Sequence, residues 1–257
     1  FNFTYVENKV TERDEAEAVK GTYRSGTGIQ NNTLWGYIAK GLYTDEDFAS
    51  PGVLAAGLPV PTFGTALRPG DIKYEDRNGD GIISGLDEGF IGGTTDPQIV
   101  YGFGSNLKYK QFDLSFFFQG IGKSERIIGG SNFIPGSGTG TLGNIYSNYE
   151  DSWTEENPSQ DVFWPRLSYG PNVNNSVAST WWKKDMSFGR LKTMEVGYTL
   201  DKKVAERMYL QGLRIYISGN NLWYVSNFKL WDPELDTGNG LKYPTTKSVL
   251  FGLSIGL

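Results

Sequence analysis

The sequence contains no cysteine and no histidine. Without cysteine the chain can form no disulfide bridge and offers no thiolate site. Without histidine it has no Ser-His-Asp triad, no imidazole general base and not the side chain that most often binds transition metals. These two absences exclude most nucleophilic hydrolase sites and most transition-metal sites.

Long apolar runs are also absent, because no window of about 18 residues is predominantly apolar. No transmembrane helix is therefore predicted, although a strand of a membrane β-barrel would show only alternation. The net charge is −5 and the sequence pI is about 5.0, and lysine and arginine are scattered rather than clustered. This charge balance argues against nucleic acid as a partner.

Glycine and aromatic residues are, by contrast, plentiful. The 257 residues include 34 glycines, and 14% of the chain is aromatic. This composition is typical of a barrel wall, with aromatic side chains outside and small or polar ones inside. Residues 1–5 already alternate like a strand, with no initiator methionine or signal peptide before them, which predicts that the chain is part of a longer protein.

Period-two alternation of apolar with small or polar residues predicts about seven strands. In the last strand, Val249, Phe251 and Leu253 share one face, while Gly252 and Ser254 share the other. A strand of a soluble sandwich could show the same pattern, so the alternation alone leaves both architectures open. The predicted strands are 1–9, 34–43, 98–109, 112–119, 187–200, 211–225 and 248–257.

Strands 98–109 and 112–119 predict a hairpin with a tight turn near Lys110. Each arm has about a dozen residues, which is long enough to cross a bilayer at a tilt. One face of the second arm carries only phenylalanine and leucine. Such an exposed row would promote aggregation in water, whereas a strand that faces lipid needs apolar side chains on that face.

The predicted connections alternate in length. Short links lie near Lys110 and at 201–210, and a link at 10–33 breaks the alternation because it is longer than a tight turn. This pattern predicts short periplasmic turns and long extracellular loops. A short helix is expected at 141–153, where apolar residues recur at helical spacing. The predicted long connections are 44–97, 123–186 and 226–244.

Residues 76–87 have the spacing of a calcium-binding loop. Oxygen-bearing residues occupy positions 1, 3, 5, 9 and 12, and Gly81 stands at position 6, where the loop must turn sharply. Ile83 at position 8 is expected to anchor the loop in an apolar core. A hard divalent cation prefers six or seven such oxygens at about 2.4 Å. The predicted ligands are Asp76, Asn78, Asp80, the carbonyl of Ile82, Ser84 and Asp87.

Two features of this loop shape the prediction. Position 12 is Asp87 rather than glutamate, so the loop is expected to accept Mg²⁺ as an alternative to Ca²⁺. No helices flank the loop, and a sensor needs a flanking helix pair to convert binding into motion. The site is therefore predicted to be structural, and the alternative is an Asp/Asn/Gly-rich turn without metal.

Two weaker candidates concern carbohydrate. Acidic residues at 155–156 and 232–236 could supply the paired carboxylates of a glycoside hydrolase, but a solvated acidic loop is favoured. Tryptophans could stack on sugars, but an interfacial aromatic girdle is favoured. No catalytic residue is predicted, and substrate-binding residues stay unknown. The residues concerned are Glu155, Glu156, Asp232, Glu234 and Asp236, and Trp181, Trp182, Trp223 and Trp231.

Several short motifs follow one another in an order that resembles the C-terminal barrel of SusC/RagA-type TonB-dependent transporters. The resemblance is firm over 69–257 and loose over 1–68. Beside the calcium-type loop, the motifs are Pro69-Gly70-Asp71-Ile72-Lys73-Tyr74, Tyr101-Gly102-Phe103, Phe118-Gln119-Gly120, Phe188-Gly189-Arg190-Leu191-Lys192, Gly197-Tyr198-Thr199-Leu200, Gly219-Asn220-Asn221-Leu222 and Asp232-Pro233-Glu234.

This resemblance implies an antiparallel transmembrane β-barrel of about 22 strands, of which residues 1–257 would be roughly the last third. The plug domain and the earlier strands would precede residue 1. Family members import glycans or peptides across the outer membrane, with a SusD-like lipoprotein as a lid and TonB as the source of energy. The metal loop is common in the family and is regarded as structural.

Three hypotheses follow from the sequence. The first is a fragment of an outer-membrane importer, which would need lipid or detergent and could not fold as an open sheet. The second is a soluble carbohydrate-binding β-sandwich, whose apolar faces would pack on each other. The third is a hydrolase with two acids about 5 to 10 Å apart in a cleft. The first is preferred, and an enzyme is not expected.

Overall fold

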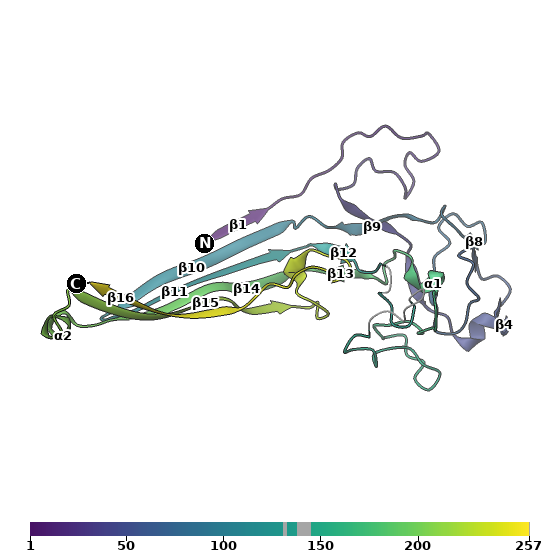
Figure 1. Ribbon diagram of the computed structural model, residues 1–257. Helices are drawn as coiled ribbons and strands as arrows, with labels where there is room; N and C mark the ends of the chain where they lie inside the picture. The colour runs from purple at the N-terminus through teal and green to yellow at the C-terminus, as the bar shows by residue number, and fades with distance from the viewer. Residues whose placement is uncertain (131–132, 138–144, 257) are drawn as a thin grey trace.

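The computed structural model describes residues 1–130, 133–137 and 145–256, and it divides into two regions (Figure 1). One region is a long antiparallel sheet. The second, which we call the loop body, is built from the described parts of the connections 6–98, 123–187 and 227–247. It lies at one end of the sheet (Figure 1). No helix in the described part of the chain has the length and apolar character needed to cross a membrane.

The sheet has six strands, and each is antiparallel to its neighbours. Their order in the sheet is their order along the chain, so the strands form a meander. The all-β antiparallel fold predicted from the alternation is confirmed. The strands are β1 (Asn2–Tyr5), β10 (Ile99–Tyr109), β11 (Phe112–Gly122), β14 (Phe188–Thr199), β15 (Gly212–Ser226) and β16 (Ser248–Gly256).

The predicted wall strand 34–43 is wrong. The structure breaks it into β2 (Thr33–Gly36) and β3 (Ala39–Leu42), which pair with β9 (Gly89–Thr94) and β7 (Ile72–Tyr74) in the loop body. The two leucines of this segment are buried there. Packing within the loop body therefore overrides the local alternation, which fits any half-buried strand.

This correction also removes the irregular link at 10–33, because residues 6–98 form one long connection between β1 and β10. The three long connections of the loop body now alternate with two short ones. The short ones are the turn at 110–111 and the link at 200–211, which contains helix α2 (Lys202–Arg207). All long connections meet at one end of the sheet, and α2 lies at the other end (Figure 1).

One face of the sheet is apolar across the strands. Phe103 stacks on its cross-strand partner Phe118, with ring centroids 4.9 Å apart. The pairing register shifts at Phe117/Phe118 and at Leu191/Thr193. Because of these shifts, apolar residues of β14 stay opposite apolar residues of β11 and β15 on both sides of the irregularity. The apolar face includes Phe103, Leu107, Tyr109, Phe112, Leu114, Phe118, Val196, Ile215, Ile217, Val249, Phe251 and Leu253.

The opposite face of the sheet is polar, and it carries ion pairs. Arg214 donates from Nε to Asp113 Oδ1 at 3.1 Å and from Nη2 to Glu195 Oε1 at 2.6 Å. The division of the two faces agrees with the predicted alternation. The polar face includes Asn106, Lys108, Asp113, Ser115, Gln119, Arg190, Glu195, Arg214 and Ser218.

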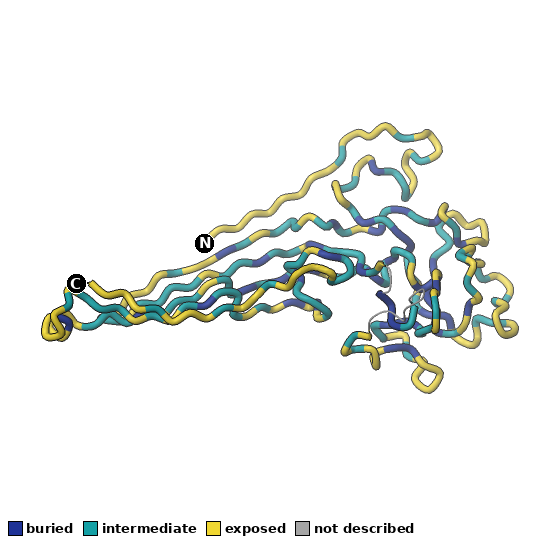
Figure 2. The backbone as a smooth tube through the Cα atoms, viewed as in Figure 1, coloured by how far each residue is buried: buried dark blue, intermediate teal, exposed yellow. Residues whose placement is uncertain are grey.

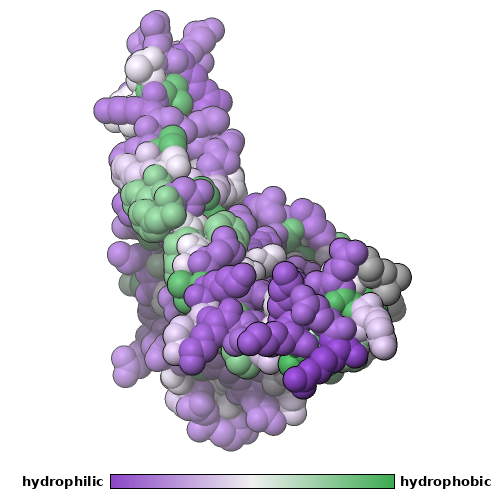
Figure 3. Space-filling view, turned by 90° about the vertical axis from the view of Figure 1, so that its left-hand side faces the viewer, coloured by the Kyte–Doolittle hydropathy of each residue, from purple (hydrophilic) through white to green (hydrophobic). Residues whose placement is uncertain are grey.

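The apolar face is open to its surroundings. Leu107 is 55% exposed and Phe251 is 84% exposed. Figure 3 shows hydrophobic side chains gathered at the surface among hydrophilic ones. A soluble sandwich would cover such a face with a second sheet. In the described part of the chain the remaining sheets are two-stranded, so the single layer argues against that alternative.

Most buried residues lie in the loop body instead, as the dark segments of Figure 2 show, and the buried apolar ones form a cluster there. Its core is rich in aromatic rings, and Trp164 and Trp182 are almost completely buried. Short elements carry the chain around this core. They are η1 (Asp45–Asp47), β4 (Phe48–Ser50), β5 (Val53–Leu54), β6 (Val60–Pro61), β8 (Ile82–Ile83), β12 (Glu125–Ile127), α1 (Val173–Ser176), β13 (Lys183–Asp185) and η2 (Pro233–Leu235).

The helix expected at 141–153 is not observed in the part that is described. Residues 141–144 lie outside the described residues, 147–150 form a turn, and Ser152 makes an isolated β-bridge with Trp164. Trp153 donates its backbone N–H to Trp164 O at 3.0 Å, and Trp164 donates to Asp151 O at 2.9 Å. Pairing with the segment around Trp164 therefore replaces the helical hydrogen bonds.

Candidate functional site

The calcium-type loop links β7 to β9 and is held at both sides. Its Ile83, predicted as an apolar anchor, is completely buried in the core of the loop body. β6 pairs with β8, and Val60 donates its N–H to Gly81 O at 3.0 Å. Gly79 and Gly81 have φ angles of 76° and 80°, which residues with a side chain rarely adopt. These glycines allow the sharp turn that the motif requires.

The carboxylates in the first half of the loop accept backbone N–H groups of the same loop. Asp76 accepts from Gly79 N at 2.7 Å and from Gly81 N at 2.8 Å. Asp80 accepts from Ile82 N at 2.9 Å, and its other oxygen accepts from the Asn78 amide at 2.9 Å. The sequence of short oxygen-bearing side chains thus folds the loop onto itself.

Asp87 closes the loop from its far end. It is completely buried, and it accepts from Arg77 N and Ser84 N, both at 2.8 Å. Burial acts to raise the pKa of Asp76, but the N–H groups of Gly81 and Gly79 outweigh it and hold that pKa below its usual range. Asp76 is therefore held in its ionised form, which can donate oxygens to a cation.

The six predicted ligand residues are all brought into one short loop, and their oxygens are those that Ca²⁺ and Mg²⁺ prefer. Among the described residues, however, no three acidic side chains are gathered closely enough to form a metal cluster by themselves. The amide of Asn78, the hydroxyl of Ser84 and the carbonyl of Ile82 must complete any such site. The donor set therefore fits a hard cation in chemistry.

Segment 10–33 braces this loop. The Arg77 guanidinium lies 3.9 Å from the centroid of the Tyr23 ring, and the Tyr23 hydroxyl donates to Leu86 O at 2.6 Å. Phe90, just after the loop, donates its N–H to Tyr23 O at 3.2 Å. Local sequence patterns do not predict this contact, because the partners are more than fifty residues apart.

A second polar site, which the sequence reasoning missed, lies at Asp71 in the centre of the loop body. Asp71 is completely buried. Its Oδ1 accepts from Arg166 Nε at 3.1 Å, from Asn172 at 3.0 Å and from Asn175 at 2.9 Å, and its Oδ2 accepts from Arg68 N at 2.9 Å. This network joins the connection 6–98 to the connection 123–187. Two features of the sequence could have indicated this site, namely Asp71 within the Pro69-Gly70-Asp71 motif and the asparagine-rich run that follows Arg166.

Gly70, next to Asp71, completes this junction. Its φ is 83°, and a Cβ there would lie 2.2 Å from the Trp153 ring. The absence of a side chain lets the indole pack directly on the backbone. The Pro69-Gly70-Asp71 motif therefore combines a close backbone approach with a buried carboxylate, and both tie the two connections together.

A third site joins the loop body to the polar face of the sheet. Arg190, which is 1% exposed, pairs with Asp232, and its Nε lies 2.8 Å from Glu234 Oε2. Lys192 pairs with Glu234, and Arg126 of β12 pairs with Asp236. We call this set of ion pairs the latch. The expectation of a solvated acidic loop at 232–236 is wrong for Asp232 and Glu234, whose side chains are only 12% and 25% exposed, whereas Asp236 is 72% exposed, as expected.

The expected aromatic girdle is wrong for three of the four tryptophans. Trp223 lies on the apolar face of β15 and is 55% exposed. Trp182 is 1% exposed, and Trp181 and Trp231 pack against the same core. The sequence shows no partner for aromatic residues in long connections and therefore predicts an interface for them, whereas in the structure they build the core of the loop body.

No family model matches this chain, but several known proteins are similar to it. TonB-dependent receptor P26 of Formosa agariphila is 32% identical and covers 72% of this chain and 19% of that receptor. TonB-dependent receptor P3 of the same organism is 28% identical and covers 99% and 26%. TonB-dependent receptor SusC of Bacteroides thetaiotaomicron is 25% identical and covers 73% and 18%.

Solved structures show the same fold. The RagAB peptide transporter matches with a TM-score of 0.63 and 23% identity, over 90% of this chain and 23% of that chain. The RagAB peptide importer in its 'open-open' state matches with a TM-score of 0.60 and 23% identity, over 88% and 22%. The chain spans about a fifth to a quarter of the length of the curated relatives above.

The antiparallel sheet and these relatives define the chain as part of a TonB-dependent receptor. Within that class it belongs to the SusC/RagA type, as the order of its motifs had indicated. The similar proteins are named as receptors and transporters, which is the class expected in place of an enzyme.

Proposed function

We propose that the whole protein imports a large nutrient across the outer membrane of a Gram-negative bacterium, with energy delivered through TonB. In this proposal residues 1–257 are the C-terminal portion of a barrel of about 22 strands. The plug domain and the earlier strands belong to the rest of the protein. The cargo is a glycan, an oligosaccharide or a peptide, and a SusD-like lipoprotein covers the extracellular face.

One observation carries this proposal. The sheet is a single layer with an apolar face, a polar face and all long connections at one end. In a barrel, lipid would cover the apolar face, and water in the lumen would hydrate the polar face. The free edges of β1 and β16 must then pair with further strands, because an unpaired edge is costly in lipid. A barrel closed by the rest of the receptor meets both needs.

The test uses the whole receptor in its native host. We expect it in the outer-membrane fraction, soluble only with detergent and purified together with a lipoprotein. Uptake of a labelled oligosaccharide or peptide should be lost when TonB is deleted, while the receptor stays in the membrane. Recovery of a folded receptor in water without detergent would contradict the proposal.

We also propose that the loop 76–87 binds Ca²⁺, or Mg²⁺ in its place, as a structural ion. Asp76, Asn78, Asp80, Ser84 and Asp87 would supply side-chain oxygens and Ile82 its carbonyl. The support is the donor set, the turn at Gly81 and the burial of Asp87. An ion that binds only the folded loop stabilises it by about 2.7 kcal/mol at a hundredfold excess over its Kd.

Chelation tests the ion. The purified receptor should lose thermal stability in the loop body when Ca²⁺ is removed by a chelator, and Ca²⁺ should restore it. Asp80→Asn should remove the response, because it deletes one carboxylate without changing shape. Asp161→Asn, at an exposed site outside the loop, is the matched control. An equal response in wild type and Asp80→Asn would contradict the assignment.

A further inference from the structure

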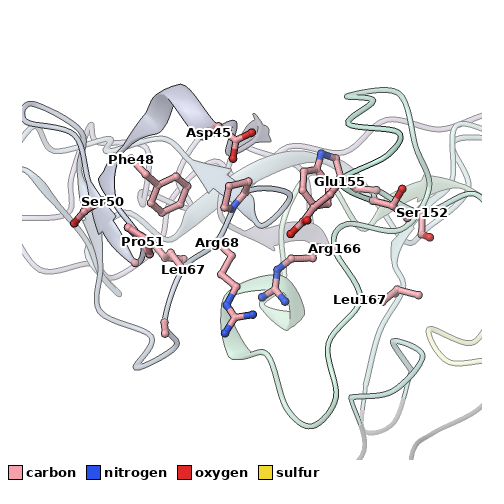
Figure 4. A pocket seen from close by; sticks show the side chains of 15 residues that line it. Asp45, Phe48, Ser50, Pro51, Leu67, Arg68, Ser152, Glu155, Arg166 and Leu167 are labelled. Atoms are coloured by element: carbon pink, nitrogen blue, oxygen red, sulfur yellow. The ribbon is translucent and has the colours of Figure 1, made fainter.

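A cavity of about 870 Å³ lies in the loop body between two connections. Residues 45–52 and 66–69 of the first connection form one side, and 152–155 and 166–167 of the second form the other (Figure 4). The volume is in the range of small-molecule sites, which commonly measure about 300–1,000 Å³. We call this cavity the inter-loop pocket.

A cationic side chain, that of Arg68, lines this pocket. Asp71 fixes the backbone N–H of Arg68 at 2.9 Å, so the base of the side chain is anchored. The Arg68 residue is nevertheless exposed, and its guanidinium has no ion pair and no hydrogen bond among the described residues. Arg166 lies beside it, but its charge is already balanced by Asp71. Arg68 thus combines an anchored backbone with a guanidinium that has no ion-pair partner among the described residues.

Uncommitted carboxylates line the same pocket. Asp45 and Glu155 are exposed, and neither has an ion pair in the described part of the chain. In Figure 4 the Arg68 and Arg166 side chains extend toward one side, and Asp45 lies on the opposite side. The pocket therefore presents opposite charges at separate places.

Apolar surface lies between these charges. Leu67 and Trp153 are buried in the pocket wall, and Phe48 and Leu167 are partly exposed. The aromatic rings are poorly placed to stack on a sugar. Trp153 is 6% exposed and packs on Gly70, and the Phe48 ring packs edge-on against Tyr43. A neutral oligosaccharide carries no formal charge, so it would offer hydrogen bonds but no ion-pair partner to Arg68, Asp45 and Glu155.

We propose that the inter-loop pocket binds a short peptide with free ends. Its terminal carboxylate pairs with the Arg68 guanidinium, its amino group lies near Asp45 or Glu155, and its apolar side chains contact Leu67 and Phe48. A zwitterionic ligand with apolar side chains is the chemistry that matches both charges and the surface between them. The biological role of this site, selection of a peptide cargo, rests on the import proposed above, whereas the binding itself does not.

The experiment measures peptide binding to the purified whole receptor in detergent by isothermal titration calorimetry. The probes are the tripeptide Ala-Leu-Ala with free ends and the same tripeptide with an amidated carboxyl end. We expect the free acid to bind wild type about tenfold or more tightly than the amide, because a charge-assisted hydrogen bond is lost. Arg68→Gln should weaken the acid to the level of the amide and leave the amide unchanged.

Arg207→Gln, an exposed arginine on α2 at the far end of the sheet, is the matched control and should bind like wild type. The assignment is overturned if acid and amide bind wild type equally, if Arg68→Gln leaves the difference intact, or if no peptide binds up to millimolar concentration. Binding of maltotriose that depends on Arg68 would overturn it as well.

These results separate the two proposals. Loss of TonB-dependent uptake concerns the whole receptor and leaves acid-selective binding measurable in detergent. A failure of acid-selective binding leaves outer-membrane location and TonB-dependent uptake to be judged independently.

Discussion

In the loop body Trp164 is completely buried, whereas in the sheet Phe251 is 84% exposed. The loop body packs its aromatic residues against one another around Asp71. The sheet instead places its apolar residues on one open face and pairs its charges on the other. The difference shows that the loop body carries its own core, while the sheet leaves its apolar surface exposed. In the barrel proposed above, lipid and neighbouring strands would bury that surface.

The largest effect is expected at the centre of the loop body. Asp71→Ala removes the buried carboxylate and leaves Arg166 and two asparagines without their acceptor. We expect a loss of about 3–5 kcal/mol in the stability of the loop body, since an uncompensated buried charge remains. Limited proteolysis of the whole receptor in detergent should show faster cleavage of the loops.

Asp161→Ala, at an exposed position in the same region, is the control for this change. The strands of the sheet should keep their protection in Asp71→Ala. Simultaneous loss of the loop body and the sheet would mean that the two regions fold as one unit, and the comparison would then fail.

The next effect concerns the sheet. Ile217→Lys places a charge on the apolar face and should cost about 2–4 kcal/mol in a bilayer if the residue lies near the midplane. Ser218→Lys places the same charge one residue away on the polar face, opposite Glu195. It should be tolerated. Unfolding of the whole receptor in lipid vesicles compares them, and an equal cost for both variants would contradict the assignment of the two faces.

A smaller effect is expected where the two regions meet. Arg190→Gln removes the buried cation of the latch and should free segment 227–247, at a local cost of about 1.5–3 kcal/mol. Hydrogen exchange should rise in this segment and stay unchanged around Asp71. Lys192→Gln, which is more exposed, should cost less than about 1 kcal/mol. Unchanged exchange in Arg190→Gln would show that packing of Trp231 alone holds the segment.

The smallest effect is a pH dependence within the loop body. Burial acts to raise the pKa of Asp47, but its bond with Lys73 outweighs this, so the pKa is lower than in the unfolded chain. The stabilisation is therefore complete above the ordinary carboxyl pKa of about 4 and is lost as pH falls through the lower, folded value. Its size is about 0.2–1 kcal/mol.

Asp47→Asn checks this last prediction. Thermal unfolding of the loop body between about pH 5 and pH 2 should show a weaker acid dependence in the variant than in wild type. Parallel curves would show that the bond to Lys73 contributes nothing measurable.

The sequence by itself determined the strands of the long sheet. Alternation placed five of the six sheet strands closely, and gave β1 as longer than it is, because a period of two is a local property of a strand with two different environments. It also located the calcium-type loop, since turn residues and short oxygen-bearing side chains act over a few neighbouring positions.

Only the tertiary structure decided the loop body. The segment 34–43 alternates like a wall strand, yet it pairs with β7 and β9, because its apolar face finds a partner that lies far along the chain. Asp71 with Arg166, and Arg190 with Asp232, are pairs separated by 95 and 42 residues. Such contacts depend on how whole connections pack together, and no local period in the sequence records that packing.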